Sequence, residues 1–139
     1  MKISRSQVRE YAFMFLYQLE IHAEDILTQK KYFLEEFPIP DDQLDFFDER
    51  VEGVYAKKQE LDQTLEPYLV KWKIERLPKI DLTILRLALY EMLEIAEIPN
   101  SVAISEAVHL AKKYSGEESK SYINAVLGNI NRQLIGEPT

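Results

Sequence analysis

The sequence predicts an all-α fold of about seven helices. Apolar residues recur at helical spacing over most of the 139 residues, strong helix formers dominate, and only four glycines occur. No segment shows the sustained alternation of apolar and polar residues that is typical of a half-buried strand. The length suits a single domain over residues 1–139, and we expect one lobe over about residues 1–75 and another over about 76–135.

The first two helices are expected before residue 38. Ser4 is a good N-cap, and the apolar stripe that follows it ends near His22. A second helix is expected over about residues 24–37. Pro38 and Pro40 stop it, because each proline lacks an amide donor and restricts the residue before it.

The third helix is expected to begin at Asp41 or Asp42, either of which can cap it. Gly53 and Pro67 argue against one unbroken helix, so we expect a kink or a restart near residues 58–67. The apolar pattern continues through this region at Leu61, Leu65, Tyr68, Leu69 and Trp72.

The second half of the chain predicts three more helices. The first follows Leu77-Pro78, and its apolar face is wide enough to indicate a central, largely buried helix. The next lies between Pro99 and the turn at residues 114–116, and the last runs from Glu117 to about Leu134. We expect the tail, residues 136–139, to be frayed.

Composition bounds the function. The net charge of −7 argues by itself against nucleic-acid binding, but residues 20–66 hold fourteen acidic and five basic residues, so the acidity is concentrated in one block. The chain has no cysteine, which excludes disulfides and thiol catalysis and is consistent with a cytoplasmic location. No apolar run approaches the roughly 18 residues that a membrane span needs.

The sequence contains no pattern typical of an enzyme. His22 and His109 fall on different predicted helices, and neither has a neighbouring histidine that would suggest metal chelation. Four scattered glycines cannot form a phosphate-binding loop, and no nucleophile elbow occurs. We therefore expect no catalytic residues, no metal and no cofactor.

Three features point to binding instead. The predicted first helix begins with Lys2, Arg5 and Arg9, although cations oppose the dipole at a helix N-terminus. Three further cations flank the turn at residues 114–116, namely Lys112, Lys113 and Lys120. Three tyrosines offer stacking surfaces for single-stranded bases, namely Tyr68, Tyr114 and Tyr122.

Three segments in the second half resemble the NusB family. Residues 80–91, IDLTILRLALYE, are similar to the family's central helix with its LR-x-A-x-YE core. Residues 99–114 resemble the following helix, and residues 122–127, YINAVL, resemble the last one. The sequence departs from the family pattern at Ser105, where asparagine or aspartate is usual, and at Ala125, where glycine is usual.

The resemblance implies a bacterial bundle of about seven helices that acts in transcription antitermination within the elongation complex. It implies binding of boxA-like single-stranded RNA together with the ribosomal protein NusE. The implied RNA-binding residues are Lys2, Arg5, Arg9, Tyr68, Lys113, Glu118, Lys120, Tyr122 and Asn124. The implied residues that bind the protein partner are Tyr17, Glu75, Arg76 and Asp81.

Two alternatives remain open at this point. The acidic block favours a protein-interaction or dimerisation module of the same fold that has weak or no RNA binding. NusB-like domains also precede cytosine methyltransferase domains, but this chain shows no methyl-donor motif, which favours a free-standing factor. Some family members dimerise, so a homodimer is a further expectation to test.

Overall fold

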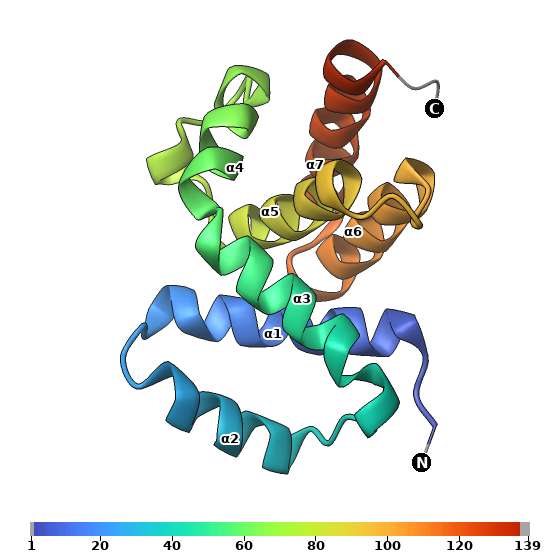
Figure 1. Cartoon of the computed structure of the whole chain (residues 1–139). Helices are drawn as coiled ribbons and strands as arrows, with labels where there is room; N and C mark the ends of the chain where they lie inside the picture. Colours follow the sequence, from blue (N-terminus) through green and yellow to red (C-terminus); the bar gives the residue numbers. More distant parts are fainter. Residues whose placement is uncertain (1, 137–139) are drawn as a thin grey trace. The chain divides into compact units, whose positions relative to one another are not determined.

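The structure, a computed structural model, describes residues 2–136 and consists there of helices and their connections, without strands (Figure 1). The predicted all-α class with about seven helices is confirmed. The α-helices are α1 (Arg5–Ile21), α2 (Ile26–Glu36), α3 (Asp41–Ala56), α4 (Lys58–Leu65), α5 (Lys79–Glu94), α6 (Asn100–Tyr114) and α7 (Glu117–Ile130). The shorter elements are the 3₁₀ helices η1 (Glu66–Tyr68) and η2 (Ile74–Arg76) and the π-helix η3 (Asn131–Ile135).

The chain divides into two compact units between Ala56 and Lys57. This division falls earlier than the lobe boundary expected near residue 75. The reason is that α4 packs on α5 and η1 packs on α7, so residues 57–75 belong with the second unit. The expected restart after α3 is confirmed, because α3 ends at Ala56 and α4 begins at Lys58.

In the first unit, α1 packs against α3 and, less extensively, against α2 (Figure 1). The backbone N–H of Gln7 donates to Ser4 Oγ over 3.0 Å, which confirms Ser4 as the N-cap of α1. The core of the unit is aromatic. The rings of Phe15, Phe33 and Phe47 lie 5.2–6.1 Å apart, and all three side chains are buried.

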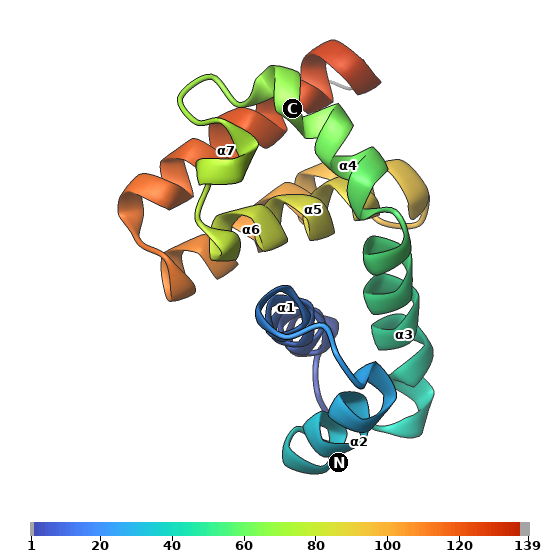
Figure 2. The ribbon, with the colours of Figure 1, turned by 90° about the vertical axis from the view of Figure 1, so that its left-hand side faces the viewer.

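In the second unit, α5 is the central helix, as its wide apolar face predicts. Every residue from 81 to 92 is buried, and α5 packs against α4, α6 and α7 (Figure 2). The buried Arg86 donates from Nε and a terminal nitrogen to both carboxylate oxygens of Asp62 on α4, over 2.7 Å each. This bidentate pair joins α4 to α5 and satisfies a charge that burial would otherwise disfavour.

The last α-helix is shorter than the expected span to about Leu134. It ends at Ile130, and the chain continues through the π-helix η3. The buried Asn100 Nδ2 donates to Asn131 Oδ1 over 2.9 Å, which fixes Asn131 where the helix widens. Gly136, with φ of 81°, then closes η3 in the left-handed conformation. The expected frayed tail beyond it lies outside the described residues.

The surface differs from the sequence prediction at one aromatic residue. Leu61, Leu65 and Leu69 are buried as their spacing predicts, but Trp72 is 39 % exposed. The helical pattern does not reach Trp72, because η1 ends at Tyr68 and an irregular loop follows.

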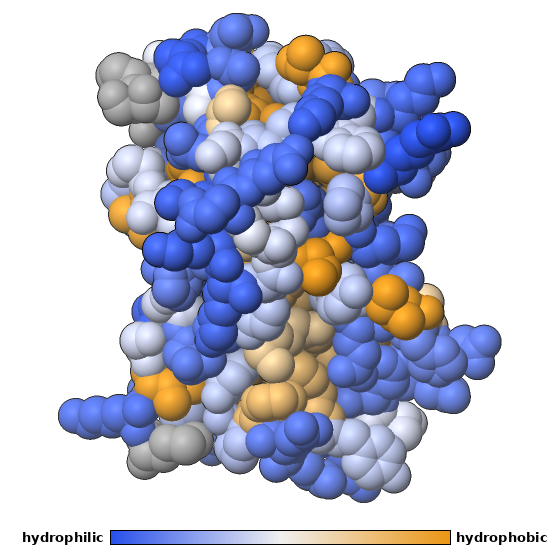
Figure 3. Space-filling model, turned by 180° about the vertical axis from the view of Figure 1, so that it is seen from behind, coloured by the Kyte–Doolittle hydropathy of each residue, from blue (hydrophilic) through white to orange (hydrophobic). Residues whose placement is uncertain are grey.

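Hydrophilic residues cover most of the face in Figure 3, with separate hydrophobic patches among them. Within residues 2–136, no helix is long and apolar enough to cross a membrane.

We predict that Asp62→Ala lowers the free energy of unfolding by about 2 kcal/mol, because it leaves Arg86 without its bidentate partner in a buried position. Urea denaturation followed by circular dichroism measures the change. The matched control is Glu94→Gln, which breaks the more exposed Lys57–Glu94 ion pair and should have a much smaller effect. Equal effects of the two substitutions would contradict the role given to Arg86.

Candidate functional site

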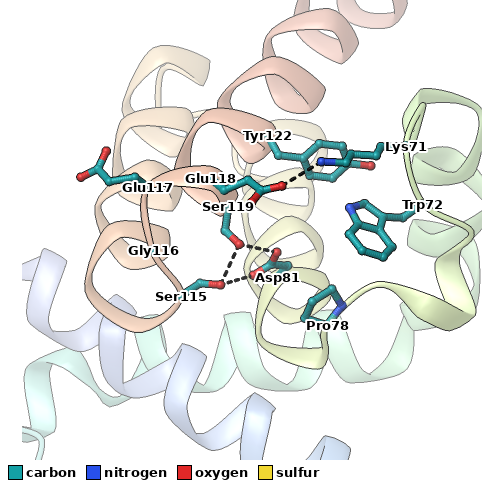
Figure 4. Close-up of a pocket in the computed structure, with 10 residues that line it drawn as sticks. All are labelled: Lys71, Trp72, Pro78, Asp81, Ser115, Gly116, Glu117, Glu118, Ser119 and Tyr122. Atoms are coloured by element: carbon teal, nitrogen blue, oxygen red, sulfur yellow. Dashed lines mark hydrogen bonds and ion pairs between the residues drawn. The ribbon is translucent and has the colours of Figure 1, made fainter.

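A polar pocket of about 340 Å³ lies within the second unit, where the start of α5 meets the turn between α6 and α7 (Figure 4). We call it the serine–aspartate pocket. Its lining residues are Lys71, Trp72, Pro78, Asp81, Ser115, Gly116, Glu117, Glu118, Ser119 and Tyr122. Three of the residues proposed from the sequence, Asp81, Glu118 and Tyr122, therefore lie together here.

Asp81 forms the floor of the pocket. Its side chain is 3 % exposed and lies in the first turn of α5, where the helix dipole stabilises a negative charge. Ser115 Oγ donates to one carboxylate oxygen over 2.7 Å, and Ser119 Oγ donates to the other over 2.8 Å. The two serine oxygens lie 2.8 Å apart, so the three side chains form one network (Figure 4). Hydrogen bonds to a carboxylate are stronger than neutral ones, so this network fixes the turn on α5.

The turn itself follows from Gly116. The backbone N–H groups of Ser115 and Gly116 both donate to the carbonyl oxygen of Ala111 over 2.8 Å, which ends α6. Gly116 has φ of 139°, a conformation that side-chain-bearing residues rarely adopt. The chain reverses there, and α7 begins at Glu117. This geometry brings Ser115 and Ser119 to the same carboxylate.

An ion pair crosses the rim of the pocket. Lys71 Nζ lies 2.8 Å from Glu118 Oε1, and both side chains are largely exposed. Their hydrogen bond and mutual attraction lower the pKa of Glu118 and raise the pKa of Lys71. Both groups are therefore charged at neutral pH, and Glu118 neutralises a cation that could otherwise bind an anion.

Tyr122 forms part of the wall. Its hydroxyl oxygen is buried and has no hydrogen-bond partner in the described part of the chain. Burial raises the pKa of Tyr122, and the nearby backbone amides of Lys71 and Trp72 and the Lys71 charge only partly offset this effect. The hydroxyl is therefore neutral at physiological pH.

Most of the residues that line the pocket are polar or charged. Both serine hydroxyls donate to Asp81, and histidine is absent from the lining residues, so the pocket contains no serine–histidine pair. Across residues 2–136, no group of three histidine, cysteine, aspartate or glutamate side chains is arranged to hold a metal ion.

Two more of the proposed RNA-binding residues flank the same turn. Lys113, near the end of α6, is exposed, and its Nζ lies 5.5 Å from the centre of the Tyr114 ring. Lys120 on α7 is half-buried, and its Nζ lies 3.3 Å from Glu117 Oε2. The second unit thus presents cations on both sides of the turn, as the spacing predicts.

The proposed RNA-binding residues of the first unit differ in exposure. Lys2 and Arg5 are exposed, whereas Arg9 is only 4 % exposed. The guanidinium carbons of Arg5, Arg9 and Arg50 lie 4.7, 5.4 and 3.4 Å from the centre of the Phe46 ring. Arg9 therefore packs as a structural cation on Phe46, and a role in RNA binding would be indirect.

The remaining proposed RNA-binding residues lie apart from the pocket. Asn124 is exposed and lines a separate groove of about 390 Å³ between α6 and α7. Two helical positions separate it from Tyr122, so the two side chains point to different faces of α7. Tyr68 is half-buried in η1.

The four residues proposed to bind the protein partner are also spread over the chain. Tyr17 is half-buried on α1, and its ring stacks on that of Phe13 with centroids 6.3 Å apart. Glu75 and Arg76 are exposed in η2. Asp81 is buried, so its carboxylate meets a partner only if its serine hydrogen bonds open.

Sequence reasoning missed Lys71, Ser119 and the exposure of Trp72. Ser119 carries no signal of its own, because its role depends on reaching a carboxylate 38 positions away. Lys71 and Lys73 flank Trp72, and this alternation of cations with an aromatic residue was the available signal. The apolar helical pattern that Trp72 continues obscures this signal.

The fold and the pocket define a small all-α protein whose charged and aromatic surface suits binding. The model of the NusB family matches residues 6–132. A transcription antitermination protein NusB from Acetivibrio thermocellus is 43 % identical over 128 residues, covering 92 % of this chain and 88 % of the relative. Another from Clostridium novyi is 40 % identical over 130 residues, covering 92 % and 98 %. The chain belongs to the NusB family.

Solved structures agree with this assignment. A structure of T. maritima NusB has a TM-score of 0.86 at 31 % identity and covers 96 % of this chain and 94 % of its own. A crystal structure of the antitermination factors NusB and NusE in complex with dsRNA has a TM-score of 0.79 at 26 % identity, covering 88 % and 92 %. The resemblance stated from residues 80–127 is therefore confirmed.

We predict that Tyr122→Phe leaves the free energy of unfolding unchanged or raises it by up to about 1 kcal/mol, because it removes a buried hydroxyl that has no hydrogen bond. The raised pKa of Tyr122 contributes stability below its unfolded value, and this contribution is lost as the pH rises through the folded value. The variant should therefore lose less stability than the wild type above about pH 10.

Urea denaturation at neutral and at alkaline pH measures both effects. The control is Tyr32→Phe, which removes the hydroxyl of a tyrosine that is 62 % exposed. A clear loss of stability in Tyr122→Phe at neutral pH would show that the hydroxyl is hydrogen-bonded.

Proposed function

We propose that this chain is a transcription antitermination factor that binds boxA-type RNA together with ribosomal protein NusE and supports ribosomal RNA transcription. The observation that carries the proposal is the 43 % identity to a transcription antitermination protein over 92 % of the chain. The similar crystal structure of NusB and NusE in complex with dsRNA supports RNA and NusE as the two binding partners. In this proposal the factor acts as part of the transcription elongation complex.

The RNA site that we propose uses cations for phosphates and aromatic faces for bases. The exposed Lys2, Arg5 and Lys113 are the phosphate contacts, and Lys120 joins them when its pair with Glu117 opens. Tyr122 and Tyr68 offer ring faces, and Asn124 offers an amide to a base edge. Arg9 acts through Phe46, by holding the helix that carries Arg5.

The NusE surface that we propose includes Tyr17, Glu75 and Arg76. Glu75 and Arg76 are exposed on neighbouring positions of η2, which suits recognition of a partner of mixed charge. We assign Asp81 a positioning role, because its carboxylate holds Ser115 and Ser119. It affects the partner surface by fixing the start of α5.

The same proposal treats the chain as non-enzymatic, free of cofactors and cytoplasmic. The relative from Acetivibrio thermocellus is a transcription antitermination protein, and both pocket serines donate to the Asp81 carboxylate, with no histidine among the lining residues. A homodimer that covers the RNA surface is a form that sedimentation of the protein alone would reveal.

A second candidate function is a protein-interaction module with little RNA affinity. The observation that favours it is the acidic block, since residues 20–66 hold nine more acidic than basic residues. Such a block repels RNA when it lies within a Debye length of the strand, about 10 Å at 0.1 M salt. Binding of NusE without RNA is the outcome that this function requires.

We predict that a labelled boxA-like RNA binds with an affinity that NusE increases and salt decreases. Fluorescence anisotropy across a salt series measures this, with single-stranded and duplex forms of the RNA compared. Arg5→Gln and Lys113→Gln should each flatten the dependence of log affinity on log salt by roughly 0.7, the value for one lost contact to a single strand.

The matched control is Lys31→Gln, because Lys31 is an exposed lysine on α2 and its loss changes the net charge equally. Equal slopes for all three variants would mean that the effect is one of total charge. Failure of RNA to bind with or without NusE, while NusE itself binds, would replace this function with the interaction module.

We also predict that Glu118→Gln increases RNA affinity by roughly two- to fivefold at low salt, because it frees Lys71 and removes a negative charge beside the turn. The advantage should disappear at high salt. Glu97→Gln is the control, since Glu97 is an exposed glutamate between α5 and α6 and its loss changes the net charge equally. An unchanged affinity for Glu118→Gln would remove this rim from the RNA path.

A further inference from the structure

Trp72 lies where two hollows of the second unit adjoin. It lines the serine–aspartate pocket, and with Lys71, Lys73 and Arg76 it also lines an open hollow of about 510 Å³. We call this second one the basic hollow. Its three charged lining residues are all cations. The two hollows share Lys71 and Trp72, so the indole stands between a polar pocket and a cationic surface.

The indole is available to a ligand. Trp72 is 39 % exposed and Val70, on the same irregular loop between η1 and η2, is 89 % exposed. Figure 4 shows Trp72 across the pocket from Ser115 and Ser119. A large aromatic side chain is usually well buried, and leaving this one exposed forgoes hydrophobic stabilisation of the fold.

The cations of the basic hollow are also available. Lys73 and Arg76 are exposed, and neither forms an ion pair within residues 2–136. Lys71 is held by Glu118, and its Nζ lies 6.0 Å from the centre of the Trp72 ring system. An anion that enters the hollow therefore meets two uncompensated cations beside an aromatic face.

This combination fits a nucleotide of a single strand. Proteins bind single strands by stacking bases on aromatic rings while cations follow the phosphates, and a duplex does not expose its base faces. An acidic peptide would use the cations but would not need the exposed indole. Tyr122 lines the same pocket as Trp72, so two aromatic residues lie along one continuous surface.

We propose that Trp72 is a base-stacking platform and that Lys73 and Arg76 bind the phosphates of the same strand, which extends the RNA site from the pocket into the basic hollow. The inference rests on the proposed RNA function. It assigns Arg76 to RNA, where the family resemblance suggests the protein partner.

The test uses the fact that Trp72 is the only tryptophan of the chain. Tryptophan fluorescence is titrated with the single-stranded boxA-like RNA, while anisotropy of labelled RNA measures binding independently. We expect saturable quenching of Trp72 whose midpoint matches the anisotropy midpoint. In mixtures with NusE, the Trp72→Tyr variant contributes no tryptophan fluorescence, so any tryptophan fluorescence that remains comes from NusE.

Substitutions separate stacking from charge. Trp72→Ala should weaken RNA binding roughly 5- to 150-fold, and Trp72→Tyr should restore most of it because the ring face remains. Lys73→Gln and Arg76→Gln should each flatten the salt dependence by roughly 0.7, and Lys31→Gln should not. Thermal melting of every variant identifies any loss that comes from unfolding.

The outcomes are distinct. RNA that binds by anisotropy without quenching, with unchanged affinity for Trp72→Ala, overturns this inference and leaves the proposed function standing. Loss of NusE binding in Trp72→Ala and Arg76→Gln, with RNA affinity unchanged, assigns the hollow to the protein partner and also overturns it. RNA that fails to bind the wild type overturns both proposals.

Discussion

The second unit depends on one buried carboxylate. Asp81 lies in the first turn of α5 and accepts hydrogen bonds from Ser115 and Ser119, which belong to the turn after α6 and to the start of α7. A carboxylate that is 3 % exposed is stable only if its oxygens are satisfied, so the two hydroxyls and the fold require each other. The network fixes where α7 begins, and with it the positions of Glu118 and Tyr122. The geometry of the candidate site is therefore set from within the core.

Charge in this protein acts locally. The total of −7 would oppose RNA, yet the screening length near physiological salt, about 8 Å, makes only nearby charges count. Around the turn, Lys71 and Lys120 are each held by a glutamate, whereas Lys73 and Arg76 are not paired within the described residues. Paired cations must give up an ion pair before they bind a phosphate. Under the proposed function, the strength of RNA binding depends on which cations are paired more than on how many there are.

The sequence was sufficient for most of the fold, because helices depend on local signals. The cap at Ser4, the stops at Pro38 and Pro40, and the wide face of α5 all follow from neighbouring residues. The site was less accessible. Asp81 could be named only by resemblance, and its partners lie 34 and 38 positions away. The spacing of Trp72 continues an apolar helical pattern, and no local rule shows that the helix ends before it. The roles proposed for individual residues in RNA and NusE binding stay predictions.

The two kinds of arginine in this chain differ in a way that bears on function. Arg9 and Arg50 are buried against Phe46, and Arg86 is buried on Asp62, so these guanidinium groups stabilise the fold and are already desolvated. Arg5 and Arg76 are exposed, and their side chains keep conformational freedom that binding must restrict. A ligand gains the most binding free energy where such an exposed cation lies beside a rigid part of the protein surface. Arg5 lies over the ring of Phe46, and Arg76 lines the basic hollow together with Trp72, so these two exposed arginines each have an aromatic side chain nearby.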